Sequence, residues 1–94
     1  MQLFQNDDVG YLTWKAENPL GFVLVSHNPP VGTYTTLHRA DCGSLNPHDA
    51  ASKNWTVLYI KACSGSRAEL EQWAVTELAA VATPCGLCVQ AGRL

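Results

Sequence analysis

Two short motifs hold the side chains best suited to chemistry. Cys85 and Cys88 are separated by Gly86 and one further residue, a spacing that lets both sulfurs meet one metal ion while backbone N–H groups point at them. His38 and Cys42 add an imidazole and a thiol with three residues between them. Thiolate and imidazole ligands suit zinc. We therefore expect a tetrahedral zinc site made of His38, Cys42, Cys85 and Cys88.

A fourth cysteine leaves the ligand set open. With Cys63 in place of His38, four cysteines would serve zinc equally well. We favour the imidazole, because a free cysteine at the end of a strand is commonly a small buried hydrophobe.

Two interpretations do without a metal. A redox CxxC motif usually has its first thiol at a helix N-terminus, whereas we expect Cys85 to follow a helix. The other option is that Cys42–Cys63 and Cys85–Cys88 are disulfides or inert thiols, although a Cys85–Cys88 bridge would close a very small ring and stabilise little. Without a signal peptide, four cysteines favour metal over disulfides.

The composition describes a single globular domain over residues 1–94. The chain has 94 residues, 47% of them hydrophobic and 15% charged, with a net charge of -2. Its apolar runs Gly21–Val25 and Ala79–Ala82 fall far below the roughly 18 residues of a membrane-spanning helix, and its start is polar and acidic. We expect no membrane association and a cytoplasmic location.

Three segments have the pattern of strands. Gly21–Ser26 is rich in β-branched and aromatic residues, Thr33–Leu37 runs into His38, and the two should pair through the proline-rich turn between them. Trp55–Lys61 is apolar on both faces, which indicates a central strand. The metal motifs would then follow the second strand and lie in the C-terminal tail.

Helices should flank these strands. Ser66 and Glu69 form a capping box ahead of an amphipathic helix over Arg67–Ala80, whose buried stripe includes Val81 at its end. A first helix over about residues 9–16 competes with a strand over Tyr11–Lys15. The predicted fold class is α+β: a small three-stranded antiparallel sheet packed by one or two helices and stabilised by zinc.

The spacing His38-x3-Cys42, followed by a strand, a capped helix and Pro84-Cys85-x2-Cys88, resembles the metal-binding domain of the bacterial Ada DNA methyl-phosphotriester repair protein. That family binds zinc through four cysteines, and the first of them accepts the methyl group. Here that position is His38, and an imidazole cannot take the thiolate's part in the transfer. The resemblance covers about residues 34–89 and implies a metal-holding role for Cys42, Cys85 and Cys88 directly and for His38 by analogy.

The front half of the chain is similar to another group. Gly10-Tyr-Leu-x-Trp14, followed by Asn18-Pro19-x-Gly-Phe-Val23, looks like small uncharacterised bacterial modules that at times lie next to nuclease domains. This likeness is at the level of the fold and implies no activity.

These observations predict a small zinc-stabilised module that binds a protein or nucleic-acid partner without catalysis. The alternative is a nucleic-acid-binding module related to the Ada domain, and a zinc-thiolate methyl acceptor is the weaker variant. The excess of acidic residues argues against extensive phosphate contacts. A local positive face would come from Arg39, Lys53, Lys61 and Arg67.

Overall fold

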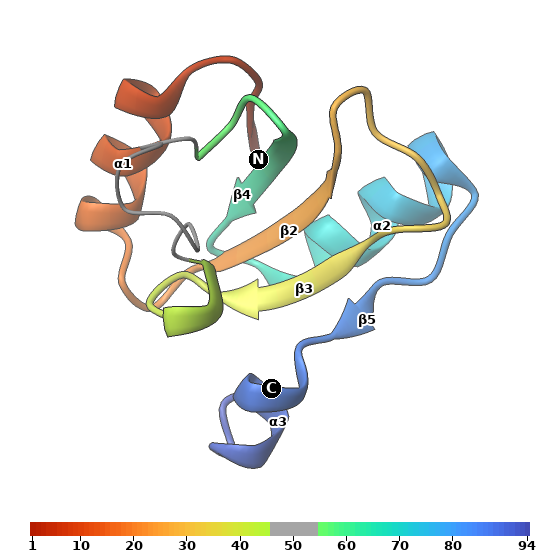
Figure 1. Ribbon diagram of the computed structural model, residues 1–94. Coiled ribbons are helices and arrows are strands. Elements are labelled where there is room, and N and C mark those ends of the chain that lie inside the picture. Colours follow the sequence, from red (N-terminus) through yellow and green to blue (C-terminus); the bar gives the residue numbers. More distant parts are fainter. Residues whose placement is uncertain (46–54) are drawn as a thin grey trace.

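The frame of the protein is a five-stranded sheet in a computed structural model that describes residues 1–45 and 55–94 (Figure 1). The strands are β1 (Gln2–Phe4), β2 (Phe22–His27), β3 (Thr36–Arg39), β4 (Tyr59–Ser64) and β5 (Thr83–Pro84). The helices are α1 (Asp8–Glu17), α2 (Arg67–Leu78) and α3 (Gly86–Gln90), with a short 3-10 helix, η1 (Gly43–Leu45). The α+β class is confirmed.

The strand order is β1-β4-β2-β3-β5. The pairs β1–β4, β4–β2 and β2–β3 are antiparallel, whereas β3 and β5 run parallel. The three predicted strands do pair antiparallel, and β2 joins β3 across the proline-rich turn as expected, but the sheet has two more strands and is mixed because of β5. The central position expected for the third predicted strand is correct, because β4 lies between β1 and β2.

The alternation of side chains along β2 divides the core into two clusters. On one face Val23 and Val25 pack against Tyr11 and Trp14 of α1. On the other face α2 packs against the sheet. The fully buried side chains there include Leu24 and Ala62 of the sheet and Leu70 and Ala74 of α2. The two longer helices thus cover opposite faces of the sheet, and the cysteines of the candidate site belong to the α1 face.

Two strands were missed because their sequences carry no strand pattern. The polar start of the chain predicts no strand, yet Gln2 pairs with Cys63 and Phe4 with Lys61 along the edge of β4. In β5 only Thr83 and Pro84 pair with β3. Such short edge strands are defined by the neighbour that they join rather than by their own composition.

Two predicted strand boundaries were wrong by several residues. The second strand begins at Thr36, and the third spans Tyr59–Ser64 instead of Trp55–Lys61. The N–H groups of Trp55 and Thr56 donate to the Asp8 carboxylate, at 3.2 and 2.8 Å, instead of to a neighbouring strand. A local side-chain acceptor on α1 therefore displaces the ladder that the apolar pattern predicts.

The predicted starts of the two longer helices agree with the structure. The first segment is a helix, not a strand, and Asp7 caps it by accepting from the N–H of Gly10 at 2.9 Å. Ser66 caps α2 by accepting from the N–H of Glu69 at 3.3 Å. The reciprocal half of the capping box is absent, because the Glu69 carboxylate accepts from the Ser64 hydroxyl instead.

The end of α2 comes earlier than predicted. Ala79 adopts a left-handed conformation with φ 51°, so the helix stops at Leu78. As a result Val81, expected on the buried stripe, is 84% exposed. Among residues 1–45 and 55–94, no helix has both the length and the apolar character that crossing a membrane requires.

Candidate metal centre

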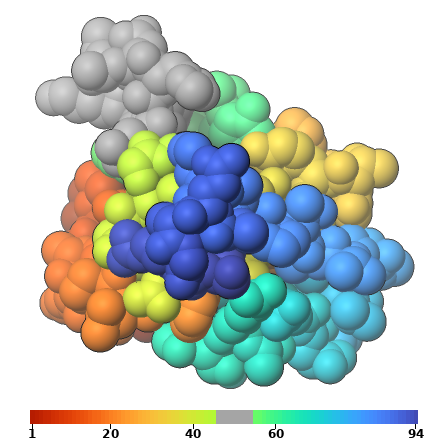
Figure 2. Space-filling view, turned by 90° about the horizontal axis from the view of Figure 1, so that it is seen from below, coloured from red at the N-terminus to blue at the C-terminus, as the bar shows by residue number. Residues whose placement is uncertain are grey.

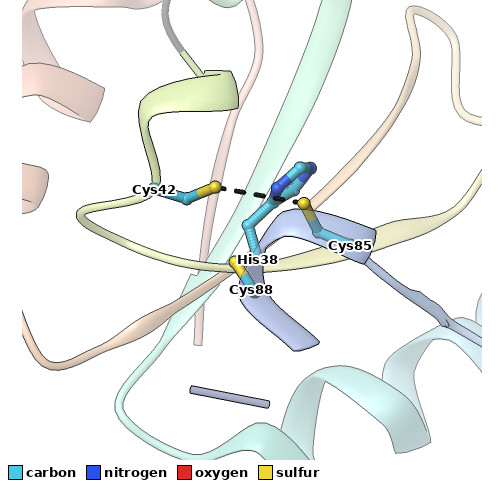
Figure 3. Close-up of side chains that lie close together, drawn as sticks. All are labelled: His38, Cys42, Cys85 and Cys88. Carbon is cyan, nitrogen blue, oxygen red and sulfur yellow. Dashed lines mark hydrogen bonds between the residues drawn. The ribbon is translucent and has the colours of Figure 1, made fainter. Parts of the chain in front are cut away.

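Four side chains from three segments converge on the α1 face of the sheet (Figure 3). His38 comes from β3, Cys42 from the turn before η1, Cys85 immediately precedes α3 and Cys88 lies within it. One potential ligand atom from each side chain lies within 4.8 Å of all the others, and all four residues are buried. The set named from the motif spacing is brought together.

The parallel pairing of β3 and β5 positions the CxxC motif. Leu37 pairs with Pro84, and the N–H of Cys85 donates to the carbonyl of Leu37 at 2.8 Å. Cys85 therefore lies next to the residue that follows Leu37, which is His38. On the other side, the N–H of Cys42 donates to the carbonyl of Arg39 at 3.0 Å and closes the turn after β3.

The sulfur atoms receive hydrogen bonds from the surrounding backbone. The N–H of Arg39 donates to Cys88 Sγ at 3.5 Å. Burial raises the pKa of Cys85, but hydrogen bonds from the Ser44 hydroxyl and from the backbone N–H groups of Cys88 and Leu87 outweigh it and lower that pKa to about 7. N–H groups directed at sulfur stabilise thiolates, which are the form that binds metals.

His38 is in the protonation state that metal binding requires. Burial, together with the positive charge of Lys61, lowers the pKa of the His38 imidazole to about 4. The ring is therefore neutral at pH 7, with one nitrogen lone pair available to a metal ion.

Burial raises the pKa of the Cys88 thiol to about 11, whereas it lowers the pKa of the His38 imidazole. The nearby sulfurs of Cys42 and Cys85 add to this shift, since a second thiolate in the same place repels the first. Sulfurs as close as Cys42 and Cys85, 4.0 Å apart, need a positive charge between them if they are to ionise together. The donor set thus matches a bound cation.

Cys63, the alternative ligand, is not part of this cluster. It lies in β4, where Val23 separates it from His38 in the same row of the sheet. The side chain is fully buried, and burial raises the pKa of its thiol to about 12. These features match the interpretation of Cys63 as a small buried hydrophobe.

The two disulfides considered above are absent, because all four cysteines are free. The position of Cys85 expected in the comparison with redox motifs was wrong, however. Cys85 does not simply follow a helix: it is the residue that precedes the first turn of α3.

The C-terminal tail has further attachments near the cluster. Arg93 forms an ion pair with Asp41 in the turn that precedes Cys42. Its backbone N–H donates to the carbonyl of Cys88 at 2.8 Å. The tail therefore folds back over the turn from which Cys42 comes.

The residues named for nucleic-acid contact do not form one positive surface in the described part of the chain. Arg39 pairs with Phe22, and Lys61 with Val25, so strand alternation places the two cations on opposite faces of the sheet. Lys61 is 5% exposed and donates to the carbonyl of Trp55 at 2.6 Å. Arg67 lies 3.4 Å from Glu71. Lys53 lies outside the described residues.

Sequence reasoning missed one residue of this region. The Ser44 hydroxyl lies 2.9 Å from Cys42 Sγ and 3.3 Å from His38 Nδ1. A serine two residues after a candidate ligand is the only signal that the sequence offers, and it is a weak one.

Comparison of the chain with protein-family models, with curated proteins and with solved structures found no significant match. The similarity to the Ada metal-binding domain therefore rests on the motif spacing and stays a prediction.

Proposed function

We propose that the protein is a small zinc-binding module without catalytic activity, in which the metal holds the C-terminal tail against the sheet. The observation that carries this proposal is the burial of His38, Cys42, Cys85 and Cys88 with their ligand atoms within 4.8 Å of one another. Three thiolates and one imidazole suit zinc, which prefers four-coordinate sulfur and nitrogen sites.

A structural role for the metal is supported by the short elements of the tail. The helix α3 has 5 residues and β5 has 2, and helices of this length are not stable by themselves. The ion pair between Arg93 and Asp41 is solvent-exposed and contributes little. A metal bound by Cys85 and Cys88 from the tail and by His38 and Cys42 from the sheet supplies the stabilisation that these short elements lack by themselves.

The outer face of α3 supports a protein partner rather than a nucleic acid. Leu87 is 60% and Val89 48% exposed on this helix, which lies at the surface in Figure 2. Exposed apolar side chains on a metal-fixed helix are suited to contact another protein. Nucleic-acid binding is the second interpretation and has less support, because Arg39 and Lys61 point to opposite faces.

Metal analysis of protein purified without added zinc tests the proposal. We expect one zinc per chain in the wild type, loss of the metal in His38→Ala and retention in Cys63→Ala. The second variant is a matched control, because it also removes a buried side chain from the same face of the sheet. Metal loss in Cys63→Ala alone would contradict the ligand set, and a metal-free wild type would contradict the function.

A further inference from the structure

The hydroxyl group of Ser44 lies beside three of the four candidate ligand atoms. It is 2.9 Å from Cys42 Sγ, 3.3 Å from His38 Nδ1 and 3.5 Å from Cys85 Sγ. Ser44 belongs to η1 and is exposed, whereas the four ligand residues are buried. Ser44 is therefore an exposed residue whose hydroxyl makes part-buried contacts with the cluster.

The single proton of this hydroxyl has three possible acceptors. A thiolate carries a negative charge and the imidazole of His38 is neutral, so the sulfurs are the stronger acceptors. The contact with Cys42 is shorter than that with Cys85, at 2.9 Å against 3.5 Å. The shorter distance makes Cys42 Sγ the favoured acceptor of this proton, ahead of Cys85 Sγ.

Cys42 depends on this one side chain more than the other sulfurs do. Cys88 receives a backbone N–H from Arg39, and Cys85 receives backbone N–H groups from α3. Over residues 1–45 and 55–94, the hydrogen-bond donor that meets Cys42 Sγ, apart from the sulfur of Cys85, is the Ser44 hydroxyl. Replacement of Ser44 by alanine removes the donor, whereas a backbone N–H is kept by every substitution except proline.

We propose that Ser44 is a positioning residue of the metal centre: its hydroxyl donates to the Cys42 thiolate and makes that sulfur less reactive. This inference rests on the proposed function. A hydrogen bond withdraws electron density from a metal-bound thiolate, so it slows attack of the sulfur on electrophiles and the metal loss that follows. The same donor also holds the η1 turn beside the cluster.

Alkylation of the zinc-loaded protein with N-ethylmaleimide tests this role. Zinc release is followed with a coloured chelator, and each modified cysteine is located by mass spectrometry. In Ser44→Ala we expect Cys42 to react about tenfold faster than in the wild type, because one hydrogen bond to a charged group changes a rate by a factor on the order of ten. Ser44→Thr keeps the hydroxyl and should restore the slow rate.

Cys63 serves as an internal reference for the fold. It is fully buried and outside the cluster, so it reacts only when the domain opens. If the role of Ser44 is specific, Ser44→Ala accelerates the alkylation of Cys42 and leaves that of Cys63 unchanged. Ser66→Ala is the matched control variant, because it removes a serine that caps α2 and should leave the rate at Cys42 unchanged.

The outcomes separate this inference from the proposed function. A wild-type rate at Cys42 in zinc-loaded Ser44→Ala overturns the role of Ser44 and leaves the zinc site standing. Equal acceleration of Cys42 and Cys63 also overturns it, since that result reports a loosened fold. A wild-type protein that holds no zinc overturns both.

Discussion

The two faces of the sheet are closed in different ways. On the α2 face, Leu24, Leu37 and Leu70 are buried with small alanines between them, so apolar packing is sufficient. On the α1 face the core cluster includes three cysteines that converge with His38. Within the described residues, the side chains that could hold a metal ion therefore gather on the second face.

Other polar groups are buried on the α1 face as well. The hydroxyl of Tyr11 has no hydrogen-bond partner within residues 1–45 and 55–94, and Lys61 holds its ammonium group over the ring of the same tyrosine at 5.7 Å. Burying a charge or an unpaired hydroxyl opposes folding. These two groups therefore offset part of the stability that apolar packing supplies on the α1 face.

In the proposed zinc-bound state, removal of the metal should have the largest effect and should act first on the α1 side. Chelation of zinc removes a contribution on the order of 10 kcal/mol of binding free energy. We expect amide hydrogen exchange to show loss of protection from Cys85 to Arg93 before the α2 face loses it. A tail that stays protected in the chelated protein would show that the metal is not what holds it.

A cavity on the other face should destabilise the fold without affecting the metal. Leu70 is fully buried, so Leu70→Ala should lower the free energy of unfolding by about 2–5 kcal/mol. Urea unfolding of the zinc-loaded protein measures this, and metal analysis should still find one zinc per chain. Leu87→Ala, at a position that is 60% exposed, is the control and should change stability by less than about 0.5 kcal/mol.

Replacement of the buried cation should produce the smallest change, in the opposite direction. Burial lowers the pKa of Lys61 to about 8 from its ordinary 10.5. Below pH 8 the folded state therefore carries a buried charge that opposes folding. After allowance for the lost hydrogen bond to Trp55, Lys61→Met should raise the free energy of unfolding at pH 7 by about 2 kcal/mol.

The pH dependence of this gain provides the check. Between pH 8 and 10.5 the unfolded wild type binds more protons at Lys61 than the folded wild type, so wild-type stability rises with pH. The advantage of Lys61→Met should therefore shrink across this range. An advantage that stays constant up to pH 10 would show that the ammonium charge is not its cause.

Much of the candidate site could be predicted from the sequence, because the ligand motifs are local. Two cysteines separated by two residues, and a histidine separated from a cysteine by three, bring their donors close together in a turn whatever the surrounding fold. The helix starts were predictable for the same reason, as Asp7 and Ser66 each cap an N–H three residues ahead.

The parts that could not be predicted depend on distant partners. The pairing of Gln2 with Cys63 and of Leu37 with Pro84 makes strands of segments that have no strand pattern of their own. The Asp8 carboxylate accepts hydrogen bonds from the N–H groups of Trp55 and Thr56, so β4 begins later in the sequence than predicted. Patterns within a few residues do not predict contacts between segments this far apart in the sequence.

The sequence by itself determined which residues have metal-binding chemistry and where the two longer helices begin, because donor type and helix capping act within a few residues. Only the tertiary structure decided that His38 rather than Cys63 lies with Cys42, Cys85 and Cys88. It also decided that Ser44 lies beside this cluster. The register of β2, β3 and β4 and the parallel contact of β5 make that choice, since they set which side chains of remote segments share one face.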